Sequence, residues 1–259
     1  MRSTQPEATS MQPQPAATFS PAAGSASGAA TNAVGSNFER PALAPLLLST
    51  KSTVWGDAAP DALEPFANTA QDRALRSSTL QRHGHRCMFC GLESLANEVH
   101  NRNDNHRDLS EENLMVADPI CHRWFHLGQL RKGEGLVVYL PGLSGRDASH
   151  LLRTILIALT CDDEAASKDA KRLLNWMASH HEYVRQRWGS SEPSAFAAAV
   201  ARTVHDDPAR RAIAFDGLAL VIHPQTVEKA TQQMRAELTA HWPVNAWPRV
   251  AHDVLNAPT

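Results

Sequence analysis

The sequence predicts an α+β fold in which a strand-containing segment rich in cysteine and histidine is followed by a mostly helical half. Three of the four cysteines and six of the thirteen histidines fall between Arg82 and Arg131. Short apolar runs bounded by turn-forming residues occur in and around this segment, a pattern typical of strands. From Leu151 onwards, apolar residues recur at the three- and four-residue spacing of amphipathic helices. We therefore expect a small element built around a Cys/His cluster, with helices after it.

The N-terminal part differs from the rest in composition. Residues 1–40 are mostly Ala, Ser, Pro, Gln, Thr and Gly, and no charge lies between Glu7 and Glu39. Such a segment buries too little apolar surface to offset the entropy lost on folding. The length of 259 residues suits one or two domains. We predict a disordered tail over 1–40 and one folded domain over 41–250, with its Cys/His core at about 82–131.

Charge and cysteine usage restrict the function classes. A formal net charge of −2 gives no electrostatic footprint of a general nucleic-acid binder. Four cysteines, two of them in a metal-like pair, favour a reducing compartment over a disulfide framework. No run approaches the roughly 18 apolar residues of a spanning helix, and the N-terminus does not resemble a secretion signal. The expected location is the cytoplasm, without direct membrane insertion.

Local signals predict the elements in chain order. Gly84 and Gly189 are placed to end helices, Ser144 to cap one, and Pro141 to close a strand. Apolar runs and periodicity supply the interiors. Strands are expected at 43–50, 96–100 and 135–140, and helices at 65–82, 121–131, 144–159, 163–188, 193–204 and 224–241. The turn Ser110–Asn113 precedes the apolar run 114–116, and 218–222 is either a short strand or a packed loop.

The cysteine turn indicates a zinc site. Two residues separate Cys87 from Cys90, which lets the chain fold around one ion before Gly91 takes a dihedral that other residues avoid. Cys121, at the start of an apolar run, is the expected third ligand. Zinc bound there would be structural, because its ligands close a loop that has few apolar residues of its own. Cys161 lies far away in sequence and is expected to be an ordinary thiol.

The fourth zinc ligand must be a histidine, because Trp124 stands where a second C-x-x-C pair would have its cysteine. His126 is preferred. His122 follows Cys121 directly, and adjacent side chains diverge by about 100° on a helix, so joint ligation is awkward. His122 remains the alternative.

A hairpin with a cysteine turn, a loop and a helix carrying further ligands is the outline of a treble-clef, or ββα-metal, unit. It resembles the element that forms the active site of HNH endonucleases. The positions that correspond to the family's active-site residues are Val99-His100, Asn113-Leu114 and the stretch from Cys121 to His126. The resemblance implies His100, Asn113 and His122 as the catalytic residues of a metal-dependent DNA endonuclease.

One position departs from the HNH pattern. Asn101 stands where those enzymes keep a general-base histidine, and a neutral amide cannot serve as a base. In a nuclease, His100 or His106 would have to act as the base, with His122 and Asp118 as the local metal ligands.

A longer resemblance, over roughly residues 42–242, is to the IcmJ (DotN) family of type IVB secretion systems and related conjugation systems. Its motifs here are Pro45-Leu46-Leu47-Leu48-Ser49 with Lys51 and Trp55, Arg86-Cys87-Met88-Phe89-Cys90-Gly91, Asn113-Leu114, Cys121, and Val138-Tyr139-Leu140-Pro141. The stretch Glu192–Phe196 and the helix ending near Trp242 extend it more weakly.

The IcmJ resemblance implies an HNH-like zinc fold with degenerate catalytic residues. It implies a non-enzymatic adaptor that binds the inner-membrane coupling ATPase and other proteins of the coupling complex. A cytoplasmic protein recruited to the inner membrane through these partners is the expected outcome, and nucleic acid is not an expected partner. Effector secretion and DNA conjugation both remain open, and an HNH-family DNA endonuclease is the alternative function.

Overall fold

The computed structural model describes residues 42–49, 70–103, 108–200 and 208–256. The chain divides after Arg40, and everything described here belongs to the unit Pro41–Thr259. The predicted tail, 1–40, lies outside the described residues. Over the described residues the fold is α+β, with many helices and two small antiparallel sheets.

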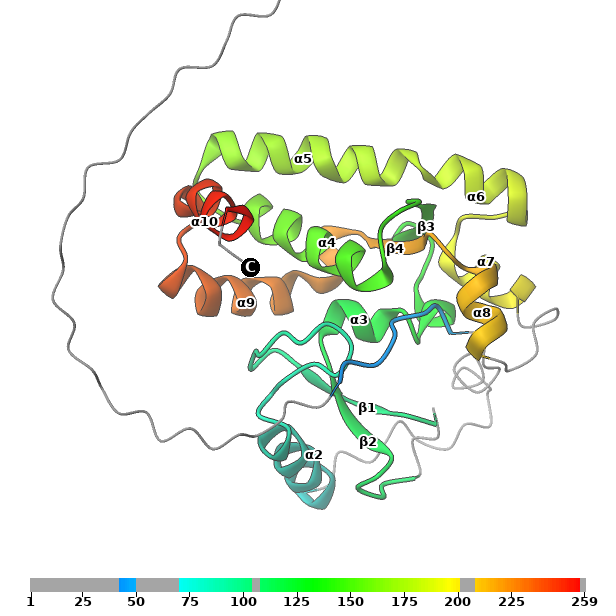
Figure 1. Ribbon diagram of the computed structural model, residues 1–259. Helices are drawn as coiled ribbons and strands as arrows, with labels where there is room; N and C mark the ends of the chain where they lie inside the picture. The colour runs from blue at the N-terminus through cyan, green and yellow to red at the C-terminus, as the bar shows by residue number, and fades with distance from the viewer. Residues whose placement is uncertain (1–41, 50–69, 104–107, 201–207, 257–259) are drawn as a thin grey trace, which may run out of the picture. The chain divides into compact units, whose positions relative to one another are not determined.

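The first half contains a helix, a hairpin and a short second helix (Figure 1). The two strands of the hairpin pair antiparallel, with Val99 opposite Val116 and His100 opposite Met115. The elements are α2 (Ala70–Arg82), β1 (Glu98–Asn101), β2 (Leu114–Ala117), α3 (Pro119–Arg123) and the 3-10 helix η1 (Leu127–Gln129). Helix α2 packs against both strands of the hairpin.

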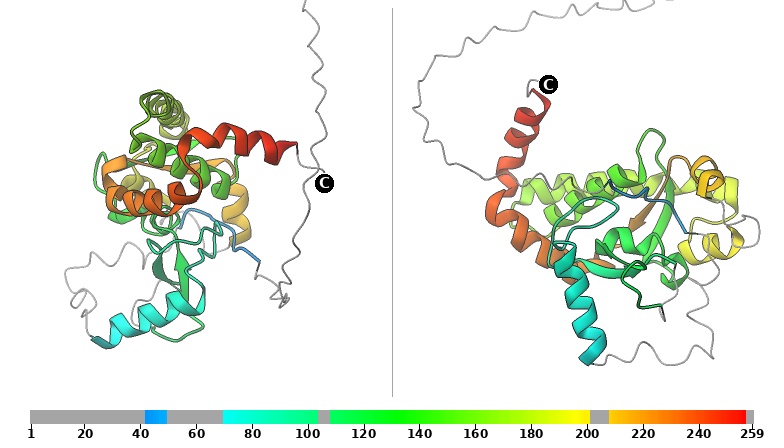
Figure 2. Two further views of the ribbon diagram at one scale, coloured as in Figure 1. Left: turned by 90° about the vertical axis from the view of Figure 1, so that its left-hand side faces the viewer. Right: turned by 60° about the horizontal axis from the view of Figure 1, so that its bottom comes forward.

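The second half is mostly helical and contains the second sheet (Figures 1 and 2). This sheet pairs two strands far apart in the sequence, with Val137 opposite Leu220. Its elements are β3 (Gly135–Tyr139), α4 (Gly145–Leu159), α5 (Glu164–Ser179), α6 (His181–Trp188), α7 (Pro193–Val200), α8 (Pro208–Ala214), β4 (Leu218–Ile222), η2 (Pro224–Val227), α9 (Glu228–His241), η3 (Val244–Ala246) and α10 (Trp247–Leu255). In both views of Figure 2, the C-terminal end of α10 points away from the other helices.

Helix α4 is the element that joins the two halves. Ser144 caps it by accepting the backbone N–H of Asp147, and its apolar stripe is buried against β4, α5 and α9. At its first residue, a Cβ on Gly145 would lie 2.4 Å from the backbone oxygen of Leu46. Only glycine permits this approach, so the start of α4 lies directly on the segment 42–49.

The core is continuous across both halves. Leu48, Trp124 and Leu127 come from the first half, and they belong to the same buried cluster as Leu152 and Leu220. The segment 42–49 is fixed at both ends, because Ala44 donates its N–H to Met88 O and Ser49 donates to Trp124 O. Together, the element order and the two sheets show the predicted α+β class, and most of the predicted elements are present.

Several boundaries differ from the sequence-based expectation. The segment 43–50 forms no strand over its described residues, although Leu46 and Leu48 are buried as expected. The helix predicted at 163–188 is interrupted at His180. The stretch 218–222 is a strand, and the short helix α8 and the C-terminal helix α10 were not expected. The predicted helix at 65–82 is present from Ala70, its first described residue.

The largest correction concerns the helix predicted at 121–131. It begins at Pro119, capped by Asp118, and ends at Arg123. Beyond that point the chain makes successive three-residue turns, in which Trp124 donates to Cys121 O and Phe125 to His122 O. The tighter winding has a packing reason, since it brings Trp124, Leu127 and Leu130, spaced by three, into the core together.

Across the described ranges, no helix has both the length and the apolar character needed to cross a membrane.

Candidate metal centres

Three cysteine sulfurs form the first candidate metal centre. The Sγ atoms of Cys87, Cys90 and Cys121 all lie within 4.8 Å of one another, and all three residues are buried. Zn–S bonds of about 2.3 Å in tetrahedral geometry place the sulfurs of one ion about 3.8 Å apart. The three sulfurs therefore suit a zinc ion, and no disulfide joins them.

The turn and α3 position these sulfurs through backbone hydrogen bonds. The N–H groups of Phe89 and Cys90 both donate to Cys87 Sγ at 3.4 Å. Gly91 follows with φ of +80°, the left-handed conformation that this turn requires. On the other side, Asp118 Oδ1 accepts the N–H groups of Ile120 at 2.9 Å and Cys121 at 3.1 Å, which fixes the first turn of α3.

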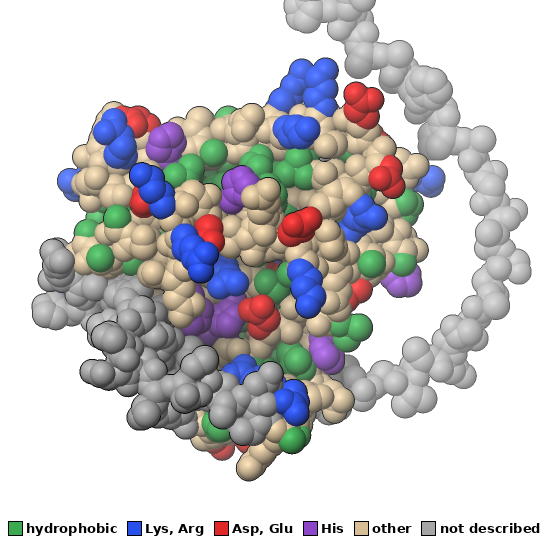
Figure 3. All heavy atoms as spheres, turned by 180° about the vertical axis from the view of Figure 1, so that it is seen from behind, with side chains coloured by type: hydrophobic (Ala, Val, Ile, Leu, Met, Phe, Trp, Pro, Cys, Tyr) green, Lys and Arg blue, Asp and Glu red, His purple; other side chains and the backbone are tan. Residues whose placement is uncertain are grey.

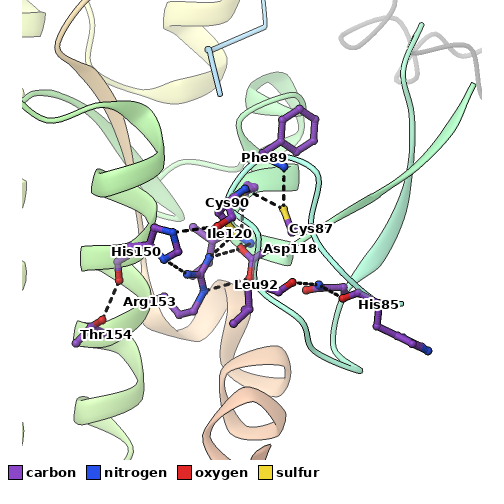
Figure 4. A network of polar contacts seen from close by, with 12 residues as sticks. His85, Cys87, Phe89, Cys90, Leu92, Asp118, Ile120, His150, Arg153 and Thr154 are labelled. Atoms are coloured by element: carbon purple, nitrogen blue, oxygen red, sulfur yellow. Dashed lines mark hydrogen bonds and ion pairs between the residues drawn. The ribbon is translucent and has the colours of Figure 1, made fainter. Parts of the chain in front are cut away.

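A buried polar network surrounds the cysteines (Figure 4). Arg153 of α4 donates from Nη2 to Cys90 Sγ at 3.2 Å and forms an ion pair with Asp118 at 3.1 Å. A ring nitrogen of His150, also on α4, lies 3.1 Å from the carbonyl oxygen of Cys90. Burial and the charge of Arg153 together lower the pKa of His150, which favours the neutral imidazole.

Hydrogen bonding among the thiols separates their pKa values. Thiol donors on Cys121 and Cys90 lower the pKa of Cys87 to about 2, so the Cys87 thiolate is favoured. The bond with Cys121 lowers the pKa of Cys90, but the bond with Cys87 and burial outweigh it and raise that pKa to about 12. Hydrogen bonds to Cys87 and Cys90, together with burial, also raise the pKa of Cys121.

We expect zinc affinity to rise steeply with pH, because a metal must displace the protons held by Cys90 and Cys121. With Cys87 already a thiolate, uptake should release about two protons, and the logarithm of affinity should rise by about two per pH unit. Chelator competition between pH 6 and 8 measures this slope. A slope near zero contradicts the expectation, and a slope near three shows that Cys87 also holds a proton.

Three histidines form a second, separate group. His100 of β1, His122 of α3 and His126 offer ring nitrogens that lie within 4.8 Å of one another. The Nε2 atoms of His122 and His126 are 3.0 Å apart. Glu98 Oε2 lies 2.6 Å from His122 Nδ1, the orientation in which a carboxylate fixes an imidazole and leaves its other nitrogen for a metal.

The charge state of Glu98 supports this pairing. Burial alone would raise the pKa of Glu98. The hydrogen bond from His122 and the positive charges of His122, Arg123 and Arg76 outweigh burial and lower this pKa below its usual value. The carboxylate is therefore ionised and holds the His122 ring in place. Imidazole groups arranged in this way suit zinc and other divalent transition metals.

The structure does not bring His126 to the cysteines. Cys121 faces the buried thiol group, whereas His122 and His126 belong to the histidine group. The early end of α3 explains this, because the tight turns at Trp124 and Phe125 carry His126 toward His122. Among the residues described, the cysteine group includes no fourth Cys, His, Asp or Glu. The structure thus gives no support to His126 or His122 as the fourth ligand.

The remaining candidates have structural contacts. Asn113 is buried, accepts the N–H of Asn103 at 2.9 Å and donates to Asp108 O at 2.8 Å. Asn101 donates to the same oxygen at 3.0 Å. Both amides therefore hold the backbone of Asp108, which precedes β2. Asp118 caps α3, and His106 lies outside the described residues.

Sequence reasoning missed Arg153, His150 and Glu98. Both α4 residues lie about 60 positions beyond the cysteine turn, and nothing in the local pattern of the helix links them to it. Glu98 had a weak signal, since it stands two residues before His100 on the same strand face.

A scan against models of protein families found no match to the chain, and a search of curated proteins found none either. The two groups of ligating side chains are therefore the main structural observations that bear on function.

Proposed function

We propose that this chain is a non-catalytic, zinc-binding adaptor of a type IVB secretion or related conjugative coupling complex. Its zinc element would be an HNH-like treble-clef unit, with Cys87 and Cys90 before the β1–β2 hairpin and Cys121 on α3. The adaptor would bind the coupling ATPase at the inner membrane and support substrate recruitment. The long resemblance to the IcmJ (DotN) family supports this role, and the grouped cysteines support the structural zinc.

The contacts of Asn101 carry the non-catalytic part of the proposal. Asn101 stands in the place of the HNH general base, is 3% exposed, and uses its amide nitrogen to hold Asp108 O. An amide with this role neither takes up a proton nor faces a substrate. The charge distribution also argues against DNA as a substrate. The net charge is −2, and basic and acidic side chains are interspersed on the face shown in Figure 3.

The helical half offers a surface for a protein partner. Leu173 and Trp176 of α5 and Tyr183 of α6 are large apolar side chains, and Trp176 is 46% exposed. Leu173 and Trp176 are spaced by three residues, which places them on the same side of α5, and Tyr183 follows on α6. Exposed apolar side chains grouped in this way are typical of protein-binding surfaces. We propose that a helix or extended segment of the ATPase's cytoplasmic tail packs there.

Binding to the ATPase tail tests the adaptor function. The purified tail should retain the wild-type chain in a pull-down, and Trp176→Glu should weaken this binding at least about tenfold, as expected for a central aromatic contact. Trp242→Glu is the matched control, because Trp242 is also exposed, at 55%, but lies at the end of α9. Retention that is absent in the wild type, or unchanged by Trp176→Glu, counts against this role.

A second candidate function is an HNH-family, metal-dependent DNA endonuclease, favoured specifically by the His100/His122/His126 group with Glu98. The histidines would hold a divalent ion that polarises a phosphate oxygen. In this case supercoiled DNA should be nicked in magnesium, manganese or nickel. His122→Ala and His100→Ala should abolish nicking while leaving the structural zinc bound.

Complementation separates the two functions in the cell. If the chain is an adaptor, deletion should abolish secretion or conjugal transfer, and the His100→Ala protein should restore it. Robust cleavage that disappears in His100→Ala, together with failure of that variant to complement, would favour the nuclease.

A further inference from the structure

The guanidinium of Arg153 contacts the two cysteine-bearing elements at once. Arg153 is 4% exposed, and its side chain comes from α4, in the helical half. Nη2 donates to Cys90 Sγ at 3.2 Å, while Nε and Nη2 reach the Asp118 carboxylate at 3.3 and 3.1 Å. Nη1 lies 2.9 Å from His150 Nδ1. Figure 4 shows this arrangement.

The positive charge of Arg153 would offset the negative charge of a zinc-bound cysteine group. Three thiolates around one divalent zinc carry a net charge of −1, and the buried Asp118 carboxylate adds another. A guanidinium is always protonated. Burying such negative charge without a nearby cation is costly, and in the network around the thiols Arg153 is the cation in contact with both Cys90 and Asp118.

The geometry also lets one side chain orient two ligands. Arg153 holds Cys90 directly. It holds Cys121 through Asp118, because the same carboxylate accepts the Cys121 backbone N–H at 3.1 Å. Partners that orient metal ligands in this way raise metal affinity, and their loss typically costs 10-fold to 100-fold.

We propose that Arg153 is a positioning residue of the zinc centre, whose guanidinium balances the excess thiolate charge and fixes Cys90 and, through Asp118, Cys121. This inference rests on the structural zinc of the proposed function. It makes metal binding depend on a residue of the helical half, so α4 must be in place for the three sulfurs to bind zinc tightly.

Arg146 provides a matched control for a merely structural role. It lies on the same helix and contacts the same cysteine turn, donating from Nε to Phe89 O at 3.1 Å. Its partner is a carbonyl oxygen rather than a thiolate, so its loss should affect packing without changing the charge at the sulfurs. Arg153→Met and Arg146→Met therefore remove similar side-chain volumes with different consequences for the metal.

The experiment measures zinc affinity by chelator competition and the thiolate-to-metal absorption band of the cobalt-substituted protein. Arg153→Met should lower zinc affinity about 10-fold to 100-fold and shift the cobalt band, because Cys90 loses its charged donor. Arg153→Lys, which keeps the charge but not the planar fork, should lose less affinity and still shift the band. Arg146→Met should retain wild-type affinity and spectrum.

Equal affinities and spectra for Arg153→Met and Arg146→Met would overturn the proposal. If Arg153→Met does not fold, Arg153→Lys decides, and a lysine variant identical to wild type in both readouts overturns it as well. Failure of the zinc centre itself looks different. In that case the wild type binds no stoichiometric zinc, or Cys87→Ser binds zinc as the wild type does.

Discussion

Replacing Cys87 with serine is expected to remove zinc from the protein and to leave the first half poorly folded. Structural zinc contributes roughly 10–16 kcal/mol of binding free energy, so one of three or four ligands carries on the order of 3 kcal/mol. That is a loss in affinity of more than about 100-fold. Cys87 Sγ also accepts two backbone N–H groups, which stabilise its thiolate. A serine hydroxyl stays neutral at physiological pH and therefore cannot replace the thiolate as a charged acceptor or as a metal ligand.

Metal analysis and solubility of the purified variant measure this effect. Wild type should carry about one zinc per chain, and Cys87→Ser should carry little and be poorly soluble. Cys161→Ser is the control, because the half-buried Cys161 thiol donates to Ile157 O on α4, away from the cysteine group. Stoichiometric zinc in Cys87→Ser would show that the three sulfurs are not the zinc site.

Trp124→Ala is expected to cost about 3–5 kcal/mol of unfolding free energy. The indole is 1% exposed, and it lies against the glycine that begins α4, so a Cβ at Gly145 would meet its ring atoms at 3.1 Å. Removing the ring opens a cavity where the two halves share a core. The loss is large for one residue because folded domains are stabilised by only about 5–15 kcal/mol.

Chemical denaturation, followed by circular dichroism, measures this loss. Trp242→Ala is a control at an exposed tryptophan and should stay within about 0.5 kcal/mol of wild type. The zinc content of Trp124→Ala should remain near that of wild type in the folded fraction, because Trp124 is not among the grouped ligands. A change below about 1 kcal/mol would mean that this part of the core collapses around the missing ring.

Local signals in the sequence were sufficient for much of the fold. The Ser144 cap and the apolar stripe after it identified α4. The strand expected at 96–100 corresponds to β1, which spans Glu98–Asn101. The C-x-x-C turn identified two grouped cysteines, and Cys121 proved to be their third partner. Apart from Cys121, these features depend on residues within one turn or one strand of each other, where spacing alone indicates geometry.

Features set by tertiary packing were not predictable in this way. The helix after Cys121 ends early because Trp124, Leu127 and Leu130 all pack inward, and this overrides helical propensity. His126 consequently lies beside His122 instead of the cysteines. Arg153 and Cys90 are 63 residues apart in the sequence, and no short sequence motif indicates that two residues so far apart are in contact.

The pairing of β3 with β4 has a consequence for how the chain is made. Roughly 80 residues separate Tyr139 from its partner Leu218, and among the described residues the sheet has these two strands alone. At about 5–20 residues per second, the ribosome needs about 4–16 s to deliver β4 after β3 has emerged. Throughout that interval the valine-rich β3 has an unpaired edge, the kind that attracts other chains. Newly made protein should therefore be most prone to aggregation before translation passes Ile222, and premature termination upstream of β4 should yield insoluble fragments even though the cysteine turn is complete.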